Sequence, residues 1–262
     1  MSAMQRWRAA LAAWAIPEEI LERSKGQSPW ELNPQLFTAA RSDTPTPPGL
    51  ATRRALEALP DGGSVLDIGC GGGAASLALA PPAARLVGID ESSGMLDRFA
   101  TSARERGVTH STVLGRWPDV SDAVERADVV VCHHVVYNVP DLGDFALALG
   151  HSARRRVVIE LTPRHPQTRN GTVWRHFWGL DRPDGPTAND AHAVLLEAGI
   201  DATLEHDTQI NAQRAPQSPR AQAEQVARMC CLGPERVDEV AAFLVEHPPE
   251  RTPPDVIWWD VA

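Results

Sequence analysis

Residues 65–73 read Val-Leu-Asp-Ile-Gly-Cys-Gly-Gly-Gly, so an acid, Asp67, lies two residues before a run of glycines. The apolar run, the glycines and the small residues 74–80 indicate a strand, a turn and a helix in that order. Glycine backbone has no side chains in the way, so its N–H groups are open to a ligand. A steric need for positive φ would explain one glycine, but not four of them. The stretch therefore predicts a loop that binds a nucleotide-like ligand.

Two acids indicate which ligand this is. A carboxylate at Asp67 would repel a pyrophosphate, which disfavours a nicotinamide dinucleotide, and it suits a ligand with a cationic end. Asp90 ends a second apolar run, 17 residues after Gly73, where a carboxylate can accept hydrogen bonds from both ribose hydroxyls. A ligand with a ribose, no phosphate and a positively charged amino-acid end is S-adenosylmethionine.

Three segments resemble class I, Rossmann-like S-adenosylmethionine-dependent methyltransferases: VLDIGCGGG at 65–73, VGIDESSGML at 87–96 and ADVVVCHHVVYNVPDL at 127–142. The whole chain is also similar to a group of actinobacterial methyltransferases whose substrates we cannot name. The resemblance covers the core from about residue 50 to 210. It implies S-adenosylmethionine as the cofactor and S-adenosylhomocysteine as the product, and it does not specify the acceptor.

The loop chemistry and the resemblance together give a set of expected cofactor-binding residues. They are Asp67, Gly69, Cys70, Gly71, Gly73, Asp90, Glu91, Met95, Arg116, Trp117, Cys132 and His133. Family members often carry an acid after the third strand to bind the adenine amino group, but Arg116 occupies that place here. Stacking of adenine on Trp117 and an acceptor at Asp119 are the alternatives.

Transfer of a methyl group from a sulfonium is an in-line displacement, so the protein mainly has to align the nucleophile with the methyl group. A hydroxyl acceptor also needs a base, whereas an amine needs only to lose its proton beforehand. The candidate catalytic residues are His133 and His134, after the fourth strand, and His176. Glu160 is a further candidate base and Tyr137 could orient the acceptor, although each of these residues could instead serve packing.

An aromatic cluster surrounds His176. Trp174, Phe177 and Trp178 could form a pocket wall, with Arg175 binding a carboxylate of the acceptor. The same spacing equally fits an amphipathic helix that buries its rings against neighbouring helices.

Alternating apolar and helical segments predict an α/β fold with a doubly wound, mostly parallel sheet. The resemblance implies that this sheet has seven strands and that its last strand is antiparallel. The expected strands are 64–68, 85–89, 111–115, 127–132, 155–161, 202–208 and 255–261. The expected helices include 3–15, 17–25, 47–59, 187–198, 218–231 and 234–246. Residues 1–45 would form an N-terminal helical cap over the cofactor mouth and 46–262 the methyltransferase domain, with insertions at about 163–186 and 210–250 on the substrate side.

The net charge, the cysteine content and the lengths of the apolar stretches exclude some classes of protein. A net charge of −9 and a pI near 5.5 argue against a broad nucleic-acid surface. The four cysteines show no metal-ligand spacing, and the end of the fourth strand lacks clustered carboxylates, so we expect no metal and no disulfide framework. No apolar stretch approaches a membrane span and no secretory signal is recognisable, which favours the cytoplasm. The oligomeric state is open, and a homodimer is one state that the sequence allows.

The predicted function is metal-independent, S-adenosylmethionine-dependent methyl transfer to an oxygen or nitrogen of a small-molecule acceptor. One alternative is an RNA or protein acceptor, which a positive patch of Arg154, Arg155 and Arg156 with Arg164 and Arg169 would favour. Another is a cofactor-binding protein that lacks transferase activity.

Overall fold

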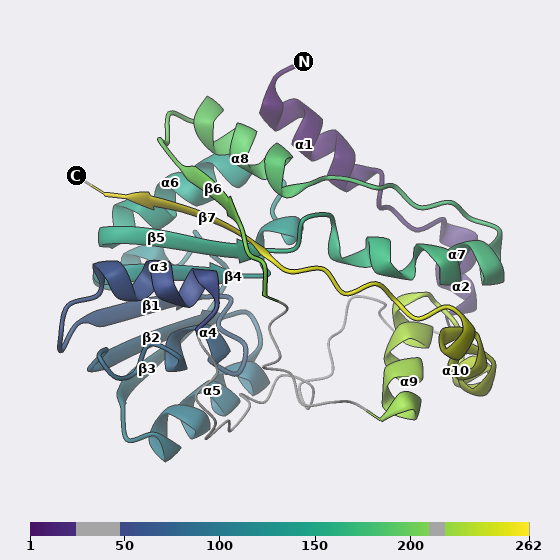
Figure 1. Cartoon of the computed structure of the whole chain (residues 1–262), viewed down its shortest axis with the longest axis horizontal. Coiled ribbons are helices and arrows are strands. Elements are labelled where there is room, and N and C mark those ends of the chain that lie inside the picture. Colours follow the sequence, from purple (N-terminus) through teal and green to yellow (C-terminus); the bar gives the residue numbers. More distant parts are fainter. Residues whose placement is uncertain (25–47, 210–217, 262) are drawn as a thin grey trace.

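The computed structural model describes residues 1–24, 48–209 and 218–261. Its single seven-stranded sheet has the order β3-β2-β1-β4-β5-β7-β6 (Figure 1). The strands are β1 Ser64–Ile68, β2 Arg85–Asp90, β3 Thr109–Leu114, β4 Ala127–His133, β5 Ala153–Leu161, β6 Thr203–His206 and β7 Asp255–Asp260. The first five pair in parallel, whereas β7 is antiparallel to both β5 and β6. The predicted sheet is confirmed.

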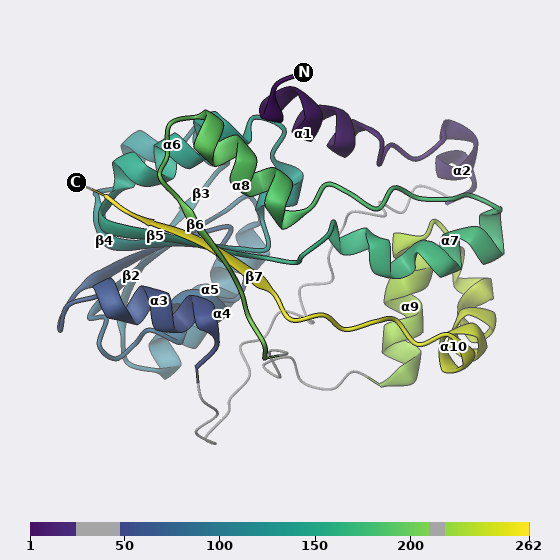
Figure 2. The same cartoon turned by 45° about the horizontal axis from the view of Figure 1, so that its top comes forward.

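Helices cover both faces of the sheet, α3, α4 and α5 on one side and α6 and α8 on the other (Figure 2). The helices are α1 Ala3–Ala12, α2 Glu18–Arg23, α3 Leu50–Ala58, α4 Ala74–Leu77, α5 Ser93–Glu105, α6 Leu142–Ser152, α7 Gly171–Trp178, α8 Ala188–Glu197, α9 Pro219–Met229 and α10 Val237–Glu246. None of them, in the part of the chain that the structure describes, has the length and apolarity needed to cross a membrane.

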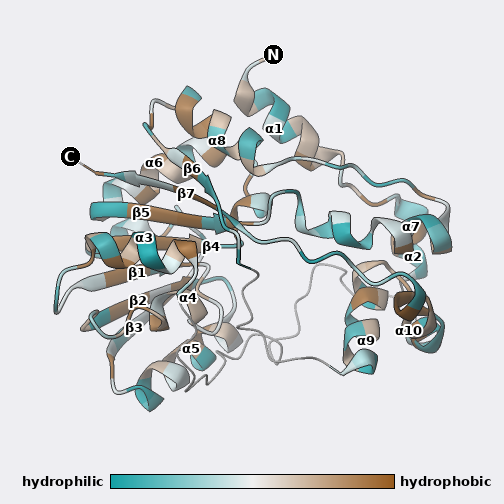
Figure 3. Ribbon diagram, in the orientation of Figure 1, coloured by the Kyte–Doolittle hydropathy of each residue, from teal (hydrophilic) through white to brown (hydrophobic). Residues whose placement is uncertain are grey.

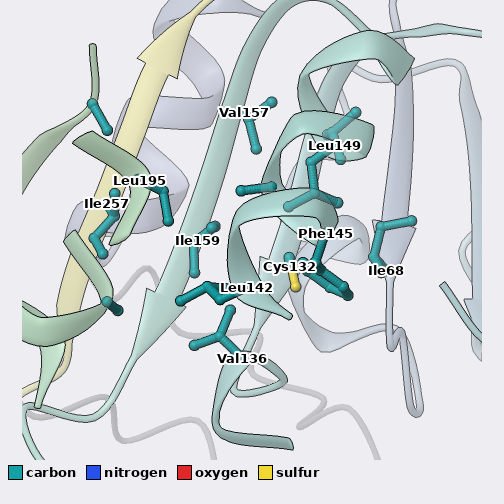
Figure 4. Packing of buried hydrophobic residues seen from close by; sticks show 14 of the residues in the cluster. Ile68, Cys132, Val136, Leu142, Phe145, Leu149, Val157, Ile159, Leu195 and Ile257 are labelled. Carbon is teal, nitrogen blue, oxygen red and sulfur yellow. The ribbon is translucent and has the colours of Figure 1, made fainter. Parts of the chain in front are cut away.

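Side chains of each strand alternate between the two cores. On β4, Val130 and Cys132 join the core under α6 and α8 (Figure 4), while Val129 and Val131 join the core under α3, α4 and α5. Apolar residues accordingly run along central strands such as β1 and β5, and polar and apolar residues mix along α8 and α9 (Figure 3). Because both faces are covered, only the ends of the strands can carry a site.

The two predicted insertions pack against each other. Helix α7 comes from the first and α9 and α10 from the second, and their apolar residues form a third core that includes Trp174, Ala227 and Val240. We call α7, α9 and α10 the helical lobe. It lies beyond the carboxyl ends of the parallel strands (Figure 1).

The described part of the predicted N-terminal cap connects the main body to the helical lobe. Glu197 of α8 accepts a hydrogen bond from the first turn of α1, at Ala3 N, and Ile20 of α2 belongs to the core of the lobe. Between them, Trp14 stacks on His165 with ring centroids 4.1 Å apart. This segment therefore packs on α8 and the lobe, and residues 25–45 of the predicted cap lie outside the described residues.

Several element boundaries differ from the predicted ones. Helix α4 ends at Leu77 rather than at residue 80, and Leu79 and Ala80 form tighter turns onto Ser76 and Leu77. Pro81 and Pro82 follow, and a proline disfavours helical backbone in the residue before it. The third strand begins two residues early, at Thr109. Helix α8 begins, as predicted, with a capping box between Thr187 and Asp190.

Candidate active site

The glycine loop is held from below by Asp67. Its buried carboxylate accepts hydrogen bonds from Ser76 Oγ at 2.6 Å and Ser76 N at 3.3 Å. Gly73 precedes α4 and offers no side chain to cap it, so Asp67 supplies the acceptor from the preceding strand. Burial raises the pKa of Asp67 to about 6, against the opposing effect of the bonds from Ser76. The sequence assigned Asp67 to the cofactor, and the structure places its carboxylate under the loop.

Left-handed backbone explains the glycines at three positions, with φ of +65° at Gly69, +51° at Gly71 and +85° at Gly73. At Gly69 an added Cβ would lie 2.4 Å from Val135 Cγ2, and at Gly73 it would lie 2.8 Å from Phe99. At Gly71 it would meet no atom within 4 Å. Gly69 and Gly73 are thus required by packing, whereas Gly71 exposes its backbone in open space.

Asp90 lies beside that open backbone at the end of β2. One of its oxygens, Oδ2, accepts a hydrogen bond from Gly71 N at 3.0 Å, and Oδ1 accepts one from Ser92 N at 2.9 Å. A carboxylate has about four acceptor positions, so each oxygen can still accept a ribose hydroxyl. The geometry fits the cofactor predicted for this loop.

Residues predicted for the adenine end separate into exposed and buried groups. The exposed side chains of Arg116 and Glu91 approach to 3.6 Å. Trp117 is buried, and its Nε1 has no hydrogen-bond partner among the residues that the structure describes. Met95, in the first turn of α5, is also buried.

The two cysteines predicted for the site are core residues. Cys132 is fully buried, and Figure 4 shows its sulfur among the apolar side chains beneath α6. Cys70 packs in the opposite core, close to Gly88. Burial raises the pKa of both thiols, so neither is a thiolate near neutral pH. Only the backbone of these two residues can face a ligand at the loop.

Two imidazoles and a carboxylate meet at the ends of β4 and β5. His133 pairs with Glu160 in the strand register, and Glu160 Oε1 lies 3.1 Å from His134 Nε2 and 3.9 Å from His133 Nδ1. His134 also donates its backbone N–H to Glu160 O at 2.7 Å. Its φ of +61° is in the left-handed region, an uncommon conformation for a non-glycine residue. We call these three residues the His–Glu cluster.

The two histidines differ in exposure. The side chain of His134 is 45% exposed and that of His133 is 17% exposed. Burial lowers the pKa of His133 despite the nearby Glu160, and His133 Nε2 has no hydrogen-bond partner among the described residues. His133 is thus held neutral, while His134 can reach a ligand.

The structure does not bring His176 to this cluster. His176 lies on α7 in the helical lobe, where its ring stacks on Phe243 of α10 at 4.5 Å and contacts Phe177. Trp174 is buried in the lobe core, and Arg175 pairs with Asp181 at 2.5 Å. These contacts support the amphipathic-helix interpretation of the aromatic cluster. A catalytic role of His176 stays a prediction.

The arginines proposed as a positive patch do not lie together. Arg154, Arg155 and Arg156 begin β5, whereas Arg164 and Arg169 follow its far end, about 25 Å along the strand. Arg156 is paired with Glu57 and Asp260. The five arginines therefore do not form one patch, and an RNA or protein acceptor stays an alternative prediction.

Some residues of the strand edge escaped the sequence analysis. Val135 restricts position 69 to glycine, and Asp207 accepts a hydrogen bond from Leu50 N at the start of α3. His206 pairs with Asp255 across β6 and β7 at 2.7 Å. The antiparallel register of β6 and β7 pairs His206 with Asp255. Neither residue belongs to a recognisable motif, so the sequence alone carries no signal for this pair.

Comparisons with known proteins agree with this geometry. Residues 65–154 match the methyltransferase domain family. Over 86 residues the chain is 41% identical to the ubiquinone biosynthesis O-methyltransferase of Azorhizobium caulinodans. This alignment covers 33% of this chain and 34% of that protein. The matched region spans little more than a third of the length of its curated relatives.

Solved structures share the fold at low identity. The YcgJ protein of Bacillus subtilis has a TM-score of 0.52 and 12% identity and covers 80% of this chain and 97% of that one. The cyclase SpnF has a TM-score of 0.50 and 15% identity and covers 99% of this chain and 96% of that one. Because a cyclase shares it, the fold alone does not decide the reaction.

The sheet order, the glycine loop and the family match together identify residues 65–154 as a class I, Rossmann-like methyltransferase domain. Its cofactor is S-adenosylmethionine. The predicted fold is confirmed, and for residues 65–154 the predicted methyltransferase domain and its cofactor are confirmed.

Proposed function

We propose that this protein transfers a methyl group from S-adenosylmethionine to a hydroxyl or amine of a small-molecule acceptor, without a metal. The observation that carries the proposal is the placement of the His–Glu cluster beside the glycine loop. β1 and β4 are neighbours at the centre of the sheet, and their carboxyl ends carry Gly69 and His133. This is the point where the strand order reverses, at which open α/β sheets bind their ligands.

When bound, S-adenosylmethionine supplies a methyl group on a positively charged sulfur that leaves as a neutral thioether. Asp90 would hold the ribose, and the backbone of Gly71 would lie against the ligand. Because Nε2 of His134 faces Glu160, a proton on Nε2 would leave Nδ1 as the free acceptor. His134 would then take the proton of a hydroxyl acceptor, and Glu160 would orient the imidazole and stabilise the positive charge it gains.

The support for a small acceptor comes from two directions. Arg156 at the start of β5 is paired with Glu57 and Asp260, and the protein carries a net charge of −9. The relative from Azorhizobium caulinodans is named an O-methyltransferase of ubiquinone biosynthesis, which favours an oxygen of a small molecule. We further propose that residues 46–262 form the methyltransferase domain, and that its helical lobe and the separate N-terminal segment enclose the acceptor.

Calorimetric titration with S-adenosylmethionine, S-adenosylhomocysteine and NAD tests the cofactor site. We expect micromolar binding of the two sulfur ligands and a loss of at least tenfold in Asp90→Ala. Asp97→Ala, an exposed acid on α5, is the matched control and should bind as the wild type does. Binding of NAD alone would contradict the proposal.

Transfer of a labelled methyl group to a panel of phenols and amines tests the base. For a phenol acceptor we expect His134→Ala to lower kcat about 10²–10⁴-fold with unchanged affinity for S-adenosylhomocysteine. His151→Ala, an exposed histidine on α6, serves as the control. Unchanged kcat in His134→Ala would remove His134 from the mechanism. Cofactor binding without transfer to any acceptor would favour a protein that lacks transferase activity.

A further inference from the structure

A second histidine–carboxylate pair lies at the same edge of the sheet. His206 ends β6 and Asp255 begins β7, and His206 Nδ1 lies 2.7 Å from Asp255 Oδ1. The carboxyl side chain is 6% exposed, whereas the imidazole side chain is 69% exposed. A buried carboxylate thus fixes one ring nitrogen and leaves the other, Nε2, facing outward.

This pair lies at the same rim of the sheet as the His–Glu cluster, on the two strands beyond β5. In the register of β5 and β7, Glu160 pairs with Val256 and Leu161 with Asp255, so the two carboxylates occupy successive positions at the rim of the sheet. The side chains of Glu160 and Asp255 therefore point to opposite faces of the sheet, and a ligand that contacts both pairs has to cross the ends of the strands between them. His206 belongs to the third strand beyond β4, which separates the two histidine positions by about 14 Å of backbone.

Tyr137, in the segment that follows β4, is a buried polar side chain on the same side of the sheet as Asp255. Burial, and to a smaller extent the charge of Asp255, raise the pKa of Tyr137. The hydroxyl of Tyr137 donates to Thr162 O at 2.6 Å. Its proton is therefore engaged elsewhere, and Asp255 is left to orient His206.

The chemistry of an outward Nε2 defines what it can bind. In the neutral imidazole with Nδ1–H on Asp255, Nε2 accepts a hydrogen bond, and in the imidazolium it donates one. A hydroxyl group satisfies both states, because it is donor and acceptor at once. A carboxylate ligand would instead face the negative charge of Asp255.

We propose that His206 binds a second hydroxyl of the acceptor, at the end remote from the hydroxyl that is methylated. The acceptor class is then an elongated diol, such as a diphenol, that spans the rim from His134 to His206. His206 is a binding residue, and Asp255 is a positioning residue that acts through it. This inference rests on the proposed function.

The test compares two phenols that differ by one remote hydroxyl. Calorimetry of the S-adenosylhomocysteine complex with 4,4′-dihydroxybiphenyl and 4-hydroxybiphenyl gives their affinity ratio. We expect the wild type to prefer the diol about tenfold, the effect of one hydrogen bond. In His206→Asn, whose amide can still donate to Asp255, the ratio should fall below twofold. Asp255→Asn should retain most of the preference and Asp255→Ala should lose it.

A purely structural pair would change thermal stability in these variants without changing the ratio. An unchanged ratio in His206→Asn, equal affinities of the two phenols for the wild type, or no binding of either would overturn the inference. His151→Asn controls for loss of an exposed histidine. The affinity for S-adenosylhomocysteine is measured first, because it separates the two proposals. A protein that does not bind S-adenosylhomocysteine would refute the methyltransferase function, and with it this inference.

Discussion

Gly69 and Gly71 share a left-handed backbone but differ in their surroundings. The first faces Val135 and the second faces open space, although in sequence they are two equivalent members of one glycine run. The packing of Val135, which follows His134, therefore distinguishes two glycines that are equivalent in the sequence motif.

We predict that Gly69→Ala and Gly71→Ala fail in different ways. Gly69→Ala should lower the free energy of unfolding by about 2–4 kcal/mol, because left-handed strain adds to the clash with Val135. Gly71→Ala carries only the strain, about 1–2 kcal/mol, but its methyl group enters the space proposed for the ligand and should weaken S-adenosylhomocysteine binding more than tenfold. Denaturant unfolding and calorimetry measure the two effects. Equal stability losses would contradict the packing argument.

At the scale of elements, the junction between β1 and α4 depends on one buried acid. Asp67 caps a helix whose own first residue is preceded by glycine, and burial raises the pKa of this carboxyl to about 6. The unfolded chain ionises Asp67 near 3.8. Between these pH values the folded state binds more protons than the unfolded state, so this group's contribution to stability is lost as pH rises from about 4 to 6.

Asp67→Asn should remove this loss of stability at higher pH, because the amide does not ionise. Its amide oxygen can still accept the hydrogen bonds from Ser76. We expect the variant to gain stability relative to the wild type as pH rises from 4 to 7, by about 2–3 kcal/mol. Denaturant unfolding at each pH measures the difference. Asp61→Asn, at an exposed acid in the same region, controls for loss of a charge. A pH-independent difference would show that burial does not perturb Asp67.

At the scale of the whole molecule, a line of rings and one cation connects the main body to the helical lobe. Tyr137 contacts His165, which stacks on Trp14, and Arg182 lies 5.0 Å from the rings of both Trp14 and Trp174. Arg182 also donates to Trp14 O and Ala15 O. The N-terminal segment thus anchors the lobe beside the candidate active site.

Trp14→Ala should loosen the lobe without unfolding the sheet. The ring is 3% exposed, and its loss should cost about 3–5 kcal/mol. Hydrogen exchange should rise in residues 3–23 and 171–182 while the strands stay protected. Arg8→Ala removes an exposed ion pair with Asp141 and should cost at most about 1 kcal/mol. Equal acceleration in the central strands would show that the segment stabilises the whole fold instead.

The sequence by itself determined the alternation of strands and helices, the glycine loop and the cofactor class, because these depend on local periodicity and on residues close together in the chain. The tertiary structure decided which polar groups meet. Glu160 joins His134 and Asp255 joins His206 only through strand register, and Arg156 of β5 pairs with the distant acids Glu57 and Asp260. Such pairings depend on contacts between segments far apart in sequence, which no local pattern encodes.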